Sequence, residues 1–372
     1  MEGRRGRKVV SALDRIYLRR ACELAERGRG STSPNPSVGA VIALGSTTLG
    51  EGYHHVRGDA HAEVEALRDA AARGNDVRGA TAYVTLEPCD HTGLTPPCSA
   101  ALIEAGIARC VVGTMDPNPR TAAGGVARLR AADIVVDVAD DAWSAAIVED
   151  FGLAVSRERP YVRLKLAASL DGYVAPRPGE RHWLTGAESR DYVRELRTRY
   201  DAVLVGAGTV RIDDPQLSAR PPRARRKPYV RIVACERDAV PLERAIFAAL
   251  EGYARTIVLA PAGLRERFAG LETVADVLYV GDADARELDL RAALAALRTR
   301  GIASVLCEGG PTLAAHLLEM NLVDRVDWLV APALLSGPTA VPALTGGPSG
   351  ITLEFDRVER LGPDVLFSAV VK

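Results

Sequence analysis

Residues that could bind a metal ion follow one another in a fixed order in the N-terminal third of the chain. His61 lies two residues before Glu63, and Cys89 and Cys98 follow with eight residues between them. Zinc binds imidazole nitrogen and thiolate sulfur tetrahedrally, and a catalytic site leaves its fourth position to water. The spacing therefore predicts zinc ligation by His61, Cys89 and Cys98, with Glu63 carrying the water's proton to a leaving amine.

The order H-x-E, P-C, C is the zinc deaminase signature, with the usual two-residue gap between the cysteines widened to eight. A closed structural site with His91 as fourth ligand is an alternative. It would leave Glu63 without a role. His91 is also only two residues from Cys89, and this short separation makes it difficult for both side chains to bind one tetrahedral ion. A disulfide is disfavoured because six scattered cysteines in 372 residues do not make a disulfide scaffold.

Periodicity places these residues at the ends of regular elements. A helix is expected to begin near His61 and to end before Gly74, a strand to cover 79–86, and a second helix to begin at Cys98. A helix N-terminus favours a thiolate and holds a ligand rigidly. Strands alternating with helices at this interval predict a layered α/β domain.

The sequence changes character near residues 155–160, where a charged, proline-containing stretch leads into a new strand. We therefore predict two domains, 1–155 and 156–372, the second also alternating strands and helices. It contains one glycine turn at Gly206 and Gly208 and another at Gly309 and Gly310 before a helix. Such turns expose backbone N–H groups to a phosphate, and two of them favour a dinucleotide cofactor.

The first domain resembles the deaminase half of the bifunctional riboflavin-biosynthesis deaminase and reductase family, through SPNPSVGAVI, HAEVEAL, ATAYVTLEPCDHTGLTPPC and DPNP. The resemblance implies a cytidine-deaminase-like three-layer αβα domain in which Asn35 and His54 contact the pyrimidine. It also implies that His91 lines the substrate side of the site rather than binding the metal. One departure is Leu94, where the family commonly has a basic residue. The substrate phosphate would then need another group, such as Arg57 or Arg120.

The second domain resembles the reductase half of the same family, through VRLKLAASLDG, HWLTG, VGAGTVRIDDPQLSAR and CEGGPTLAAHLL. The resemblance implies a dihydrofolate-reductase-like α/β domain that uses NADPH. The implied cofactor-binding residues are Ala167, Trp183, Thr209, Asp213 and Gly310. The implied substrate-binding residues are Arg181, Arg197, Leu217, Arg220 and Glu308, the first of which stands with His182 where the family has Ser-Gln. Lys165 and Asp213 are the candidates to orient or protonate the reacting sugar imine.

Together the halves imply hydrolytic deamination of 2,5-diamino-6-ribosylamino-4(3H)-pyrimidinone 5′-phosphate at zinc, followed by NADPH reduction of the ribosyl side chain to ribityl. An alternative is a single-function deaminase of another nucleobase with a degenerate reductase half. A zinc-stabilised nucleic-acid-binding module is disfavoured, because the net charge is −1 and only 5% of residues are aromatic. We expect a cytoplasmic homo-oligomer, dimer or tetramer, with a phosphorylated small-molecule substrate and neither nucleic-acid nor membrane partners.

Overall fold

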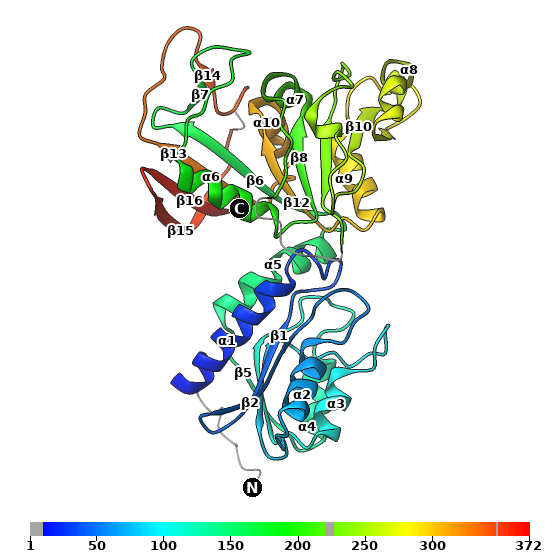
Figure 1. Cartoon of the computed structure of the whole chain (residues 1–372), viewed down its shortest axis with the longest axis vertical. Coiled ribbons are helices and arrows are strands. Elements are labelled where there is room, and N and C mark those ends of the chain that lie inside the picture. The colour runs from blue at the N-terminus through cyan, green and yellow to red at the C-terminus, as the bar shows by residue number, and fades with distance from the viewer. Residues whose placement is uncertain (1–9, 220–226, 347–348) are drawn as a thin grey trace. The chain divides into compact units, whose positions relative to one another are not determined.

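The computed structural model describes residues 10–219, 227–346 and 349–372. The chain divides into two compact units, Met1–Ser156 and Arg157–Lys372 (Figure 1). Each unit has its own sheet with helices packed on it, so the layered α/β character predicted for both halves is confirmed. Within these described ranges, no helix is both long and apolar enough to cross a bilayer.

The sheet of the first unit has the strand order β2-β1-β3-β4-β5. Strand β1 is antiparallel to both of its neighbours, whereas β3, β4 and β5 are mutually parallel. The elements of this unit are α1 (Ala12–Gly28), β1 (Gly39–Leu44), β2 (Thr47–Tyr53), α2 (Ala62–Ala72), β3 (Thr81–Leu86), α3 (Cys98–Glu104), β4 (Arg109–Thr114), α4 (Gly124–Ala131), β5 (Val135–Val138) and α5 (Ala142–Ser156).

Both faces of this sheet are buried, because successive side chains of a strand point to opposite faces. Ile42 of β1 packs into a core with α2, α3 and α4, whereas its neighbours Val41 and Ala43 pack against α1. Helix α5 joins α1 on that second face through Ile147 and Val148. The unit is thus a three-layer αβα sandwich (Figure 1).

The main sheet of the second unit has the strand order β11-β10-β9-β8-β12-β6-β13-β16-β15, and β7 and β14 pair in a separate two-stranded sheet. The strands from β11 to β13 in this order are parallel, and β16 is antiparallel to both β13 and β15. The strands of this unit are β6 (Tyr161–Ser169), β7 (Tyr173–Ala175), β8 (Ala202–Gly206), β9 (Val230–Ala234), β10 (Ile257–Pro261), β11 (Asp276–Val280), β12 (Ser304–Gly309), β13 (Arg325–Ala331), β14 (Val341–Pro342), β15 (Leu353–Leu361) and β16 (Asp364–Val371).

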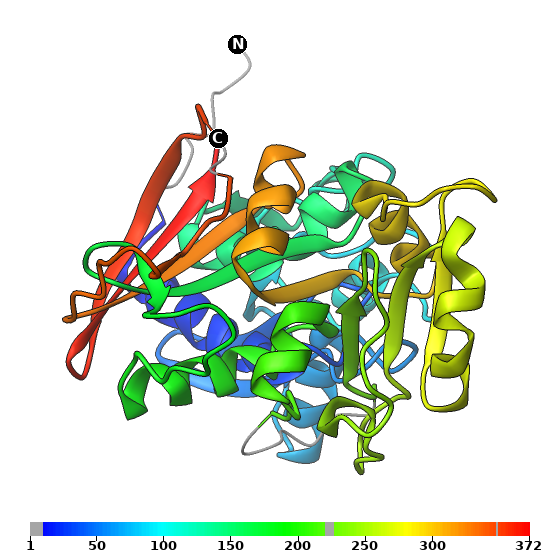
Figure 2. The same cartoon turned by 90° about the horizontal axis from the view of Figure 1, so that it is seen from above.

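Helices cover both faces of this second sheet as well. Leu204 of β8 packs into a core with α9 and α10, and the flanking Val203 and Val205 face α7 and α8. Helix α6 packs over β13 and β16 through Val193. The hairpin β15–β16 lies at one edge of the sheet (Figure 2). The helices are α6 (Ala187–Arg197), α7 (Ala207–Asp213), η1 (Ala245–Phe247), η2 (Ala262–Leu264), α8 (Arg265–Phe268), η3 (Ala269–Thr273), α9 (Leu290–Thr299) and α10 (Pro311–Glu319).

Candidate active sites

Helix α2 holds His61 and Glu63 against the sheet of the first unit. His61 is the N-cap residue of α2, and its side chain makes no capping hydrogen bond, so the imidazole can bind a partner outside the helix. The helix packs so closely on β2 that a Cβ added to Gly52 would lie 2.4 Å from the backbone nitrogen of Ala66. Only glycine permits this approach, and the contact fixes where the start of α2 lies relative to the strands.

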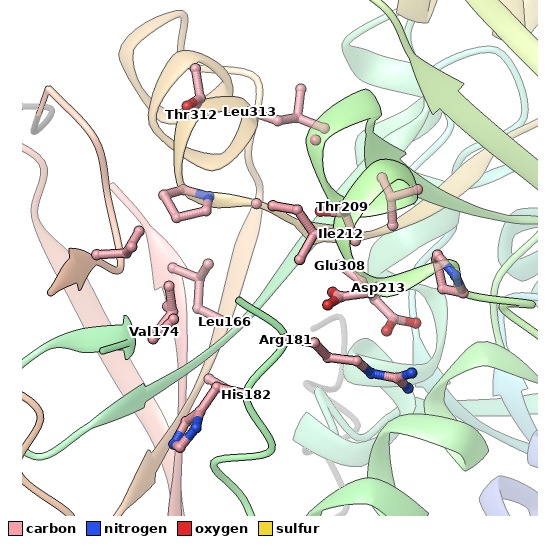
Figure 3. Close-up of a pocket in the computed structure, with 18 of the residues that line it drawn as sticks. Leu166, Val174, Arg181, His182, Thr209, Ile212, Asp213, Glu308, Thr312 and Leu313 are labelled. Carbon is pink, nitrogen blue, oxygen red and sulfur yellow. The ribbon is translucent and has the colours of Figure 1, made fainter. Parts of the chain in front are cut away.

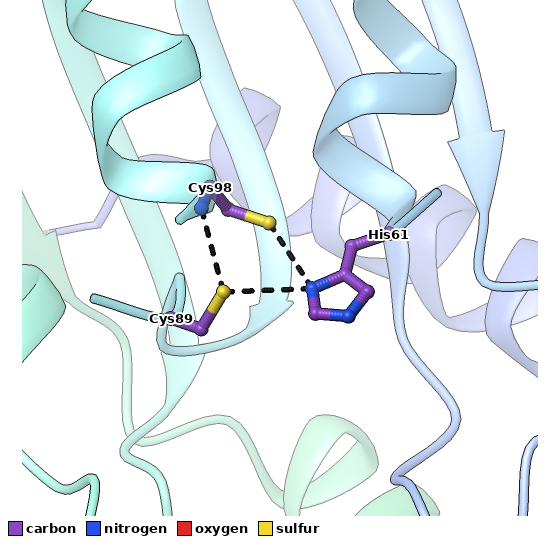
Figure 4. Close-up of side chains that lie close together, drawn as sticks. All are labelled: His61, Cys89 and Cys98. Carbon is purple, nitrogen blue, oxygen red and sulfur yellow. Dashed lines mark hydrogen bonds between the residues drawn. The ribbon is translucent and has the colours of Figure 1, made fainter. Parts of the chain in front are cut away.

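The two cysteines converge on the same nitrogen of His61 (Figure 4). The Sγ atoms of Cys89 and Cys98 lie 3.5 and 3.3 Å from Nδ1, and the ligand atoms of the three residues all lie within 4.8 Å of one another. Cys89 follows β3, and Cys98 is the first residue of α3, whose backbone N–H points at the Cys89 sulfur. One nitrogen and two sulfurs at such spacing suit a tetrahedral zinc ion with one open position.

Glu63 is buried in the first turn of α2, beside this cluster. It is 4% exposed and lines the same cavity as His61 and Cys89. Burial raises the pKa of Glu63 from its ordinary 4.5 to about 7, and the negative charge of Cys89 acts in the same direction. A carboxyl group with this pKa can both accept and release a proton near neutral pH.

The cavity next to the cluster has a volume of about 280 Å³. Asn35, His54 and His91, which the resemblance assigns to the pyrimidine, all line it. His54 donates from Nδ1 to the carbonyl oxygen of Ala60 at 3.1 Å, so its Nε2 can accept from the amide of Asn35 at 3.5 Å. Burial lowers the pKa of His54, which keeps the ring neutral in this arrangement.

Several residues that line this cavity were not predicted from the sequence: Thr95, Asp116, Asn118, Thr121 and Phe151. Glu87 was not predicted either; its carboxylate accepts from the backbone N–H groups of Ala123 and Val126 at 2.9 and 3.0 Å and so caps α4. That cap holds the loop after β4 against the end of β3. No local sequence pattern indicates this cap, because its two partners lie 36 and 39 residues further along the chain.

The second unit contains a larger cavity of about 1120 Å³. It lies at the carboxyl ends of β6, β8 and β12, where ligands bind in open parallel sheets. The predicted residues in the described part of this unit all line it: Lys165, Ala167, Arg181, Trp183, Arg197, Thr209, Asp213, Leu217, Glu308 and Gly310. Arg220 lies outside the described residues.

The predicted glycine turn after β12 is present and tightly built. Gly309 and Gly310 have φ angles of 59° and 116°, which favour glycine, and Pro311 begins α10. Thr209 of α7 donates its hydroxyl to the carbonyl oxygen of Gly309 at 3.0 Å and so ties the two turns together. The first turn differs from expectation, because only Gly206 precedes α7 and Gly208 lies within the helix.

Charged residues converge in this cavity. The carboxylates of Asp213 and Glu308 point into the same space, with the guanidinium of Arg181 nearby (Figure 3). Burial lowers the pKa of Lys165, and the neighbouring Glu308 and Asp213 partly offset this. Burial raises the pKa of Asp213, with Arg181 and Lys165 opposing the shift.

Arg197 forms an ion pair with Glu308. Its Nε and Nη2 atoms donate to the Glu308 carboxylate at 2.5 and 2.8 Å, and Nη1 donates to the carbonyl oxygen of Ser218 at 2.9 Å. Trp183 is 64% exposed and is stacked by Arg181, whose guanidinium carbon lies 4.7 Å from the ring centroid. The cavity wall thus combines an aromatic face with fixed positive charge.

Comparisons with known proteins give matches for both units. Residues 11–114 match the cytidine and deoxycytidylate deaminase zinc-binding region, and residues 160–367 match the RibD C-terminal domain. The chain is 37% identical to the riboflavin biosynthesis protein RibD of Actinobacillus pleuropneumoniae over 98% of this chain and 96% of the relative. It is 38% identical to RibD of Escherichia coli strain K12, over 96% and 99% respectively.

Solved structures show the same similarity. Acinetobacter baumannii RibD, form 1, superimposes with a TM-score of 0.82 at 35% identity, covering 97% of this chain and 99% of that one. A Thermotoga maritima diaminohydroxyphosphoribosylaminopyrimidine deaminase/5-amino-6-(5-phosphoribosylamino)uracil reductase superimposes with a TM-score of 0.83 at 34% identity, covering 96% and 98%. The matches confirm the predicted fold class of each domain and the two predicted cofactors, zinc and NADPH. The chain therefore belongs to the RibD family of bifunctional, zinc-dependent deaminases and NADPH-dependent reductases of riboflavin biosynthesis, and it contains both domains.

Proposed function

We propose that the first unit deaminates 2,5-diamino-6-ribosylamino-4(3H)-pyrimidinone 5′-phosphate and that the second unit reduces the ribosyl chain of the product to ribityl. One observation carries the deaminase half: His61, Cys89 and Cys98 converge beside the buried Glu63 in a cavity of about 280 Å³. The Thermotoga relative is named for these two activities, which supports the choice of substrate.

His61, Cys89 and Cys98 would hold the zinc ion, which when bound lowers the pKa of water toward ~7 and makes a nucleophile available at neutral pH. Glu63 would take a proton from the attacking water and deliver it to the departing amino group. A C–O bond to the ring carbon thus replaces the C–N bond, ammonia leaves, and a carbonyl remains. The raised pKa of Glu63 supports this double role, since the same group must first accept and then release a proton.

Asn35 orients the pyrimidine in this proposal. Its amide N–H is turned toward Nε2 of His54, so its carbonyl oxygen is left to accept from a ring N–H or amino group of the substrate. His91 lines the cavity as a substrate-side residue. The substrate phosphate is assigned to Arg57, because Arg57 is the only lysine or arginine among the described residues that line the cavity.

In the second unit the ribosylamine opens to an imine, and NADPH when bound supplies the hydride that reduces it. Ala167, Trp183, Thr209, Asp213 and Gly310 are the proposed cofactor contacts. Lys165 or Asp213 would orient and protonate the imine, which is supported by their position in one cavity with opposed pKa shifts. Glu308, with Leu217, Arg181 and the undescribed Arg220, would contact the substrate, and Arg197 would act by positioning Glu308.

The experiment that tests the deaminase assignment compares Glu63→Gln with wild type. The variant should retain one zinc per chain and lose ammonia release by at least ~100-fold. Retained ammonia release would remove Glu63 from the mechanism. NADPH oxidation on the already deaminated substrate serves as the control and should be unchanged, because Glu63 belongs to the other unit.

We further propose that the chain forms a homo-oligomer, dimer or tetramer, in the cytoplasm. Strand β15 supports pairing with a second copy, because it is the last strand of its sheet and is exposed along most of its length, with Phe355 and Val358 outward. Light scattering of wild type and Val358→Glu would measure the assembly and test this edge. Thiolate zinc ligands are consistent with a reducing compartment.

A further inference from the structure

The two ring nitrogens of His61 face different partners. Nδ1 faces the sulfurs of Cys89 and Cys98, as described above. On the opposite side of the ring, Nε2 lies 3.3 Å from the hydroxyl oxygen of Thr95. A neutral imidazole has one protonated nitrogen and one lone pair, so the partner of Nε2 determines whether Nδ1 can bind a metal.

We propose that Thr95 is a positioning residue of the zinc site. Its hydroxyl oxygen accepts the Nε2–H of His61, and this hydrogen bond selects the tautomer whose Nδ1 lone pair faces both sulfurs. Histidine ligands of metals almost always donate their second N–H to an oxygen in this way, which fixes the ring and increases its basicity. The inference rests on the proposed role of His61 as a zinc ligand.

The loop between the cysteines gives Thr95 this position. Thr95 lies three residues before Cys98, and its carbonyl oxygen accepts from the N–H of Gly93 at 3.2 Å, which folds the loop back on itself. Ser99 donates to the Asp90 carboxylate at 2.6 Å and so holds the two ends of the loop together. The deaminase signature with two residues between its cysteines has no loop of this length at that point. The eight-residue spacing between the cysteines thus provides the loop that positions Thr95.

Thr95 also lines the cavity beside the zinc ligands, so a contact with substrate is the competing role. The two roles differ in what the loss of the hydroxyl changes. A substrate contact alone would change the KM for ammonia release and leave zinc affinity untouched. A hydrogen bond to His61 changes zinc affinity in the absence of any substrate.

The test measures the zinc dissociation constant by competition with a chromogenic chelator, using the full chain at neutral pH. Thr95→Val keeps the shape of the side chain and removes the hydroxyl, and it should weaken zinc binding roughly 10- to 100-fold. Thr95→Ser should restore the affinity to within about threefold of wild type, because it restores the acceptor. Thr92→Val, at an exposed position of the same loop, is the matched control and should leave the affinity unchanged.

A Thr95→Val affinity equal to that of wild type would overturn the inference, as would a loss that Thr95→Ser does not restore. A second measurement does not depend on any variant. In the zinc-loaded wild type, ¹⁵N NMR of His61 should show the proton on Nε2, and a proton on Nδ1 would contradict the inference. If wild type binds no zinc at all, the proposed function of the site fails instead, so the two failures are distinguishable.

Discussion

Arg197 holds Glu308 by two parallel hydrogen bonds at the base of the reductase cavity. Burial raises the pKa of Glu308, but the positive charge of Arg197 outweighs it and the pKa lies below its ordinary value. Arg197 therefore holds Glu308 as an anion in the cavity, where we propose that Glu308 contacts the substrate. The guanidinium fork suits this task better than an ammonium group, because it matches both carboxylate oxygens at once.

Replacing Arg197 by methionine should lower reductase kcat/KM by at least about 100-fold, since Glu308 would lose the partner that orients it and keeps it charged. Once Arg197 is replaced, Glu308→Gln should cause little further loss, so the double variant should lose less than the two single losses combined. NADPH oxidation on the deaminated substrate measures the effect. Strictly additive losses would show that the two residues act independently, and ammonia release should be unchanged throughout.

Glu63 should destabilise the zinc-free protein at alkaline pH. Its folded pKa of about 7 lies above the ordinary 4.5, so its contribution to stability is present below pH ~4.5 and is lost as pH rises through 7. Glu63→Gln should therefore stabilise the zinc-free deaminase unit by about 2–3 kcal/mol at pH ~8 and by little at pH ~4.5. Urea unfolding at both pH values measures this. An equal effect at both would contradict the raised pKa.

Among the cysteines, only Cys89 and Cys98 should be needed for zinc binding. Cys98→Ala should lose the ion and ammonia release together, because two donors cannot complete the site. Cys110→Ala is the matched control, since Cys110 is also fully buried but lies on β4, outside the cluster of ligands. Zinc content by atomic emission distinguishes them. Zinc retained in Cys98→Ala would exclude Cys98 as a ligand.

Arg57 should determine the affinity of the deaminase unit for its phosphorylated substrate. Arg57→Met should raise KM by about 10- to 100-fold with little change in kcat, as expected for the loss of a charge-assisted hydrogen bond of roughly 1.5–3 kcal/mol. Arg120→Met is the control, because Arg120 does not line the cavity. Initial rates of ammonia release give both constants. A KM increase in Arg120→Met alone would show that Arg120, rather than Arg57, contacts the substrate phosphate.

Elements with strong periodicity could be predicted from the sequence. The helix predicted from His61 to before Gly74 is α2, Ala62–Ala72, and the strand predicted over 79–86 contains β3. The zinc-ligand candidates were predictable because they lie at the ends of these elements. The hairpin β15–β16 was not predicted, since β15 is exposed over most of its length and its charged sequence shows no buried face.

The residues that support the sites were harder to predict. Glu87 caps α4 from a position 36 residues earlier than one of its partners, Ala123, so no local pattern indicates the bond. Thr95 reaches His61 only after the loop between the cysteines has folded back. Arg197 reaches Glu308 across 111 residues of sequence. Such pairs depend on tertiary packing, which periodicity does not encode.

In the proposed function one chain deaminates the substrate first and then reduces it. This order is tested by following NADPH oxidation by the full chain with either the diaminopyrimidine phosphate or its deaminated product, with and without a zinc chelator. We expect oxidation with both substrates, and chelation should abolish it for the diamino compound alone. NADPH oxidation that continues on the diamino compound after zinc removal and without ammonia release would show that reduction does not depend on prior deamination.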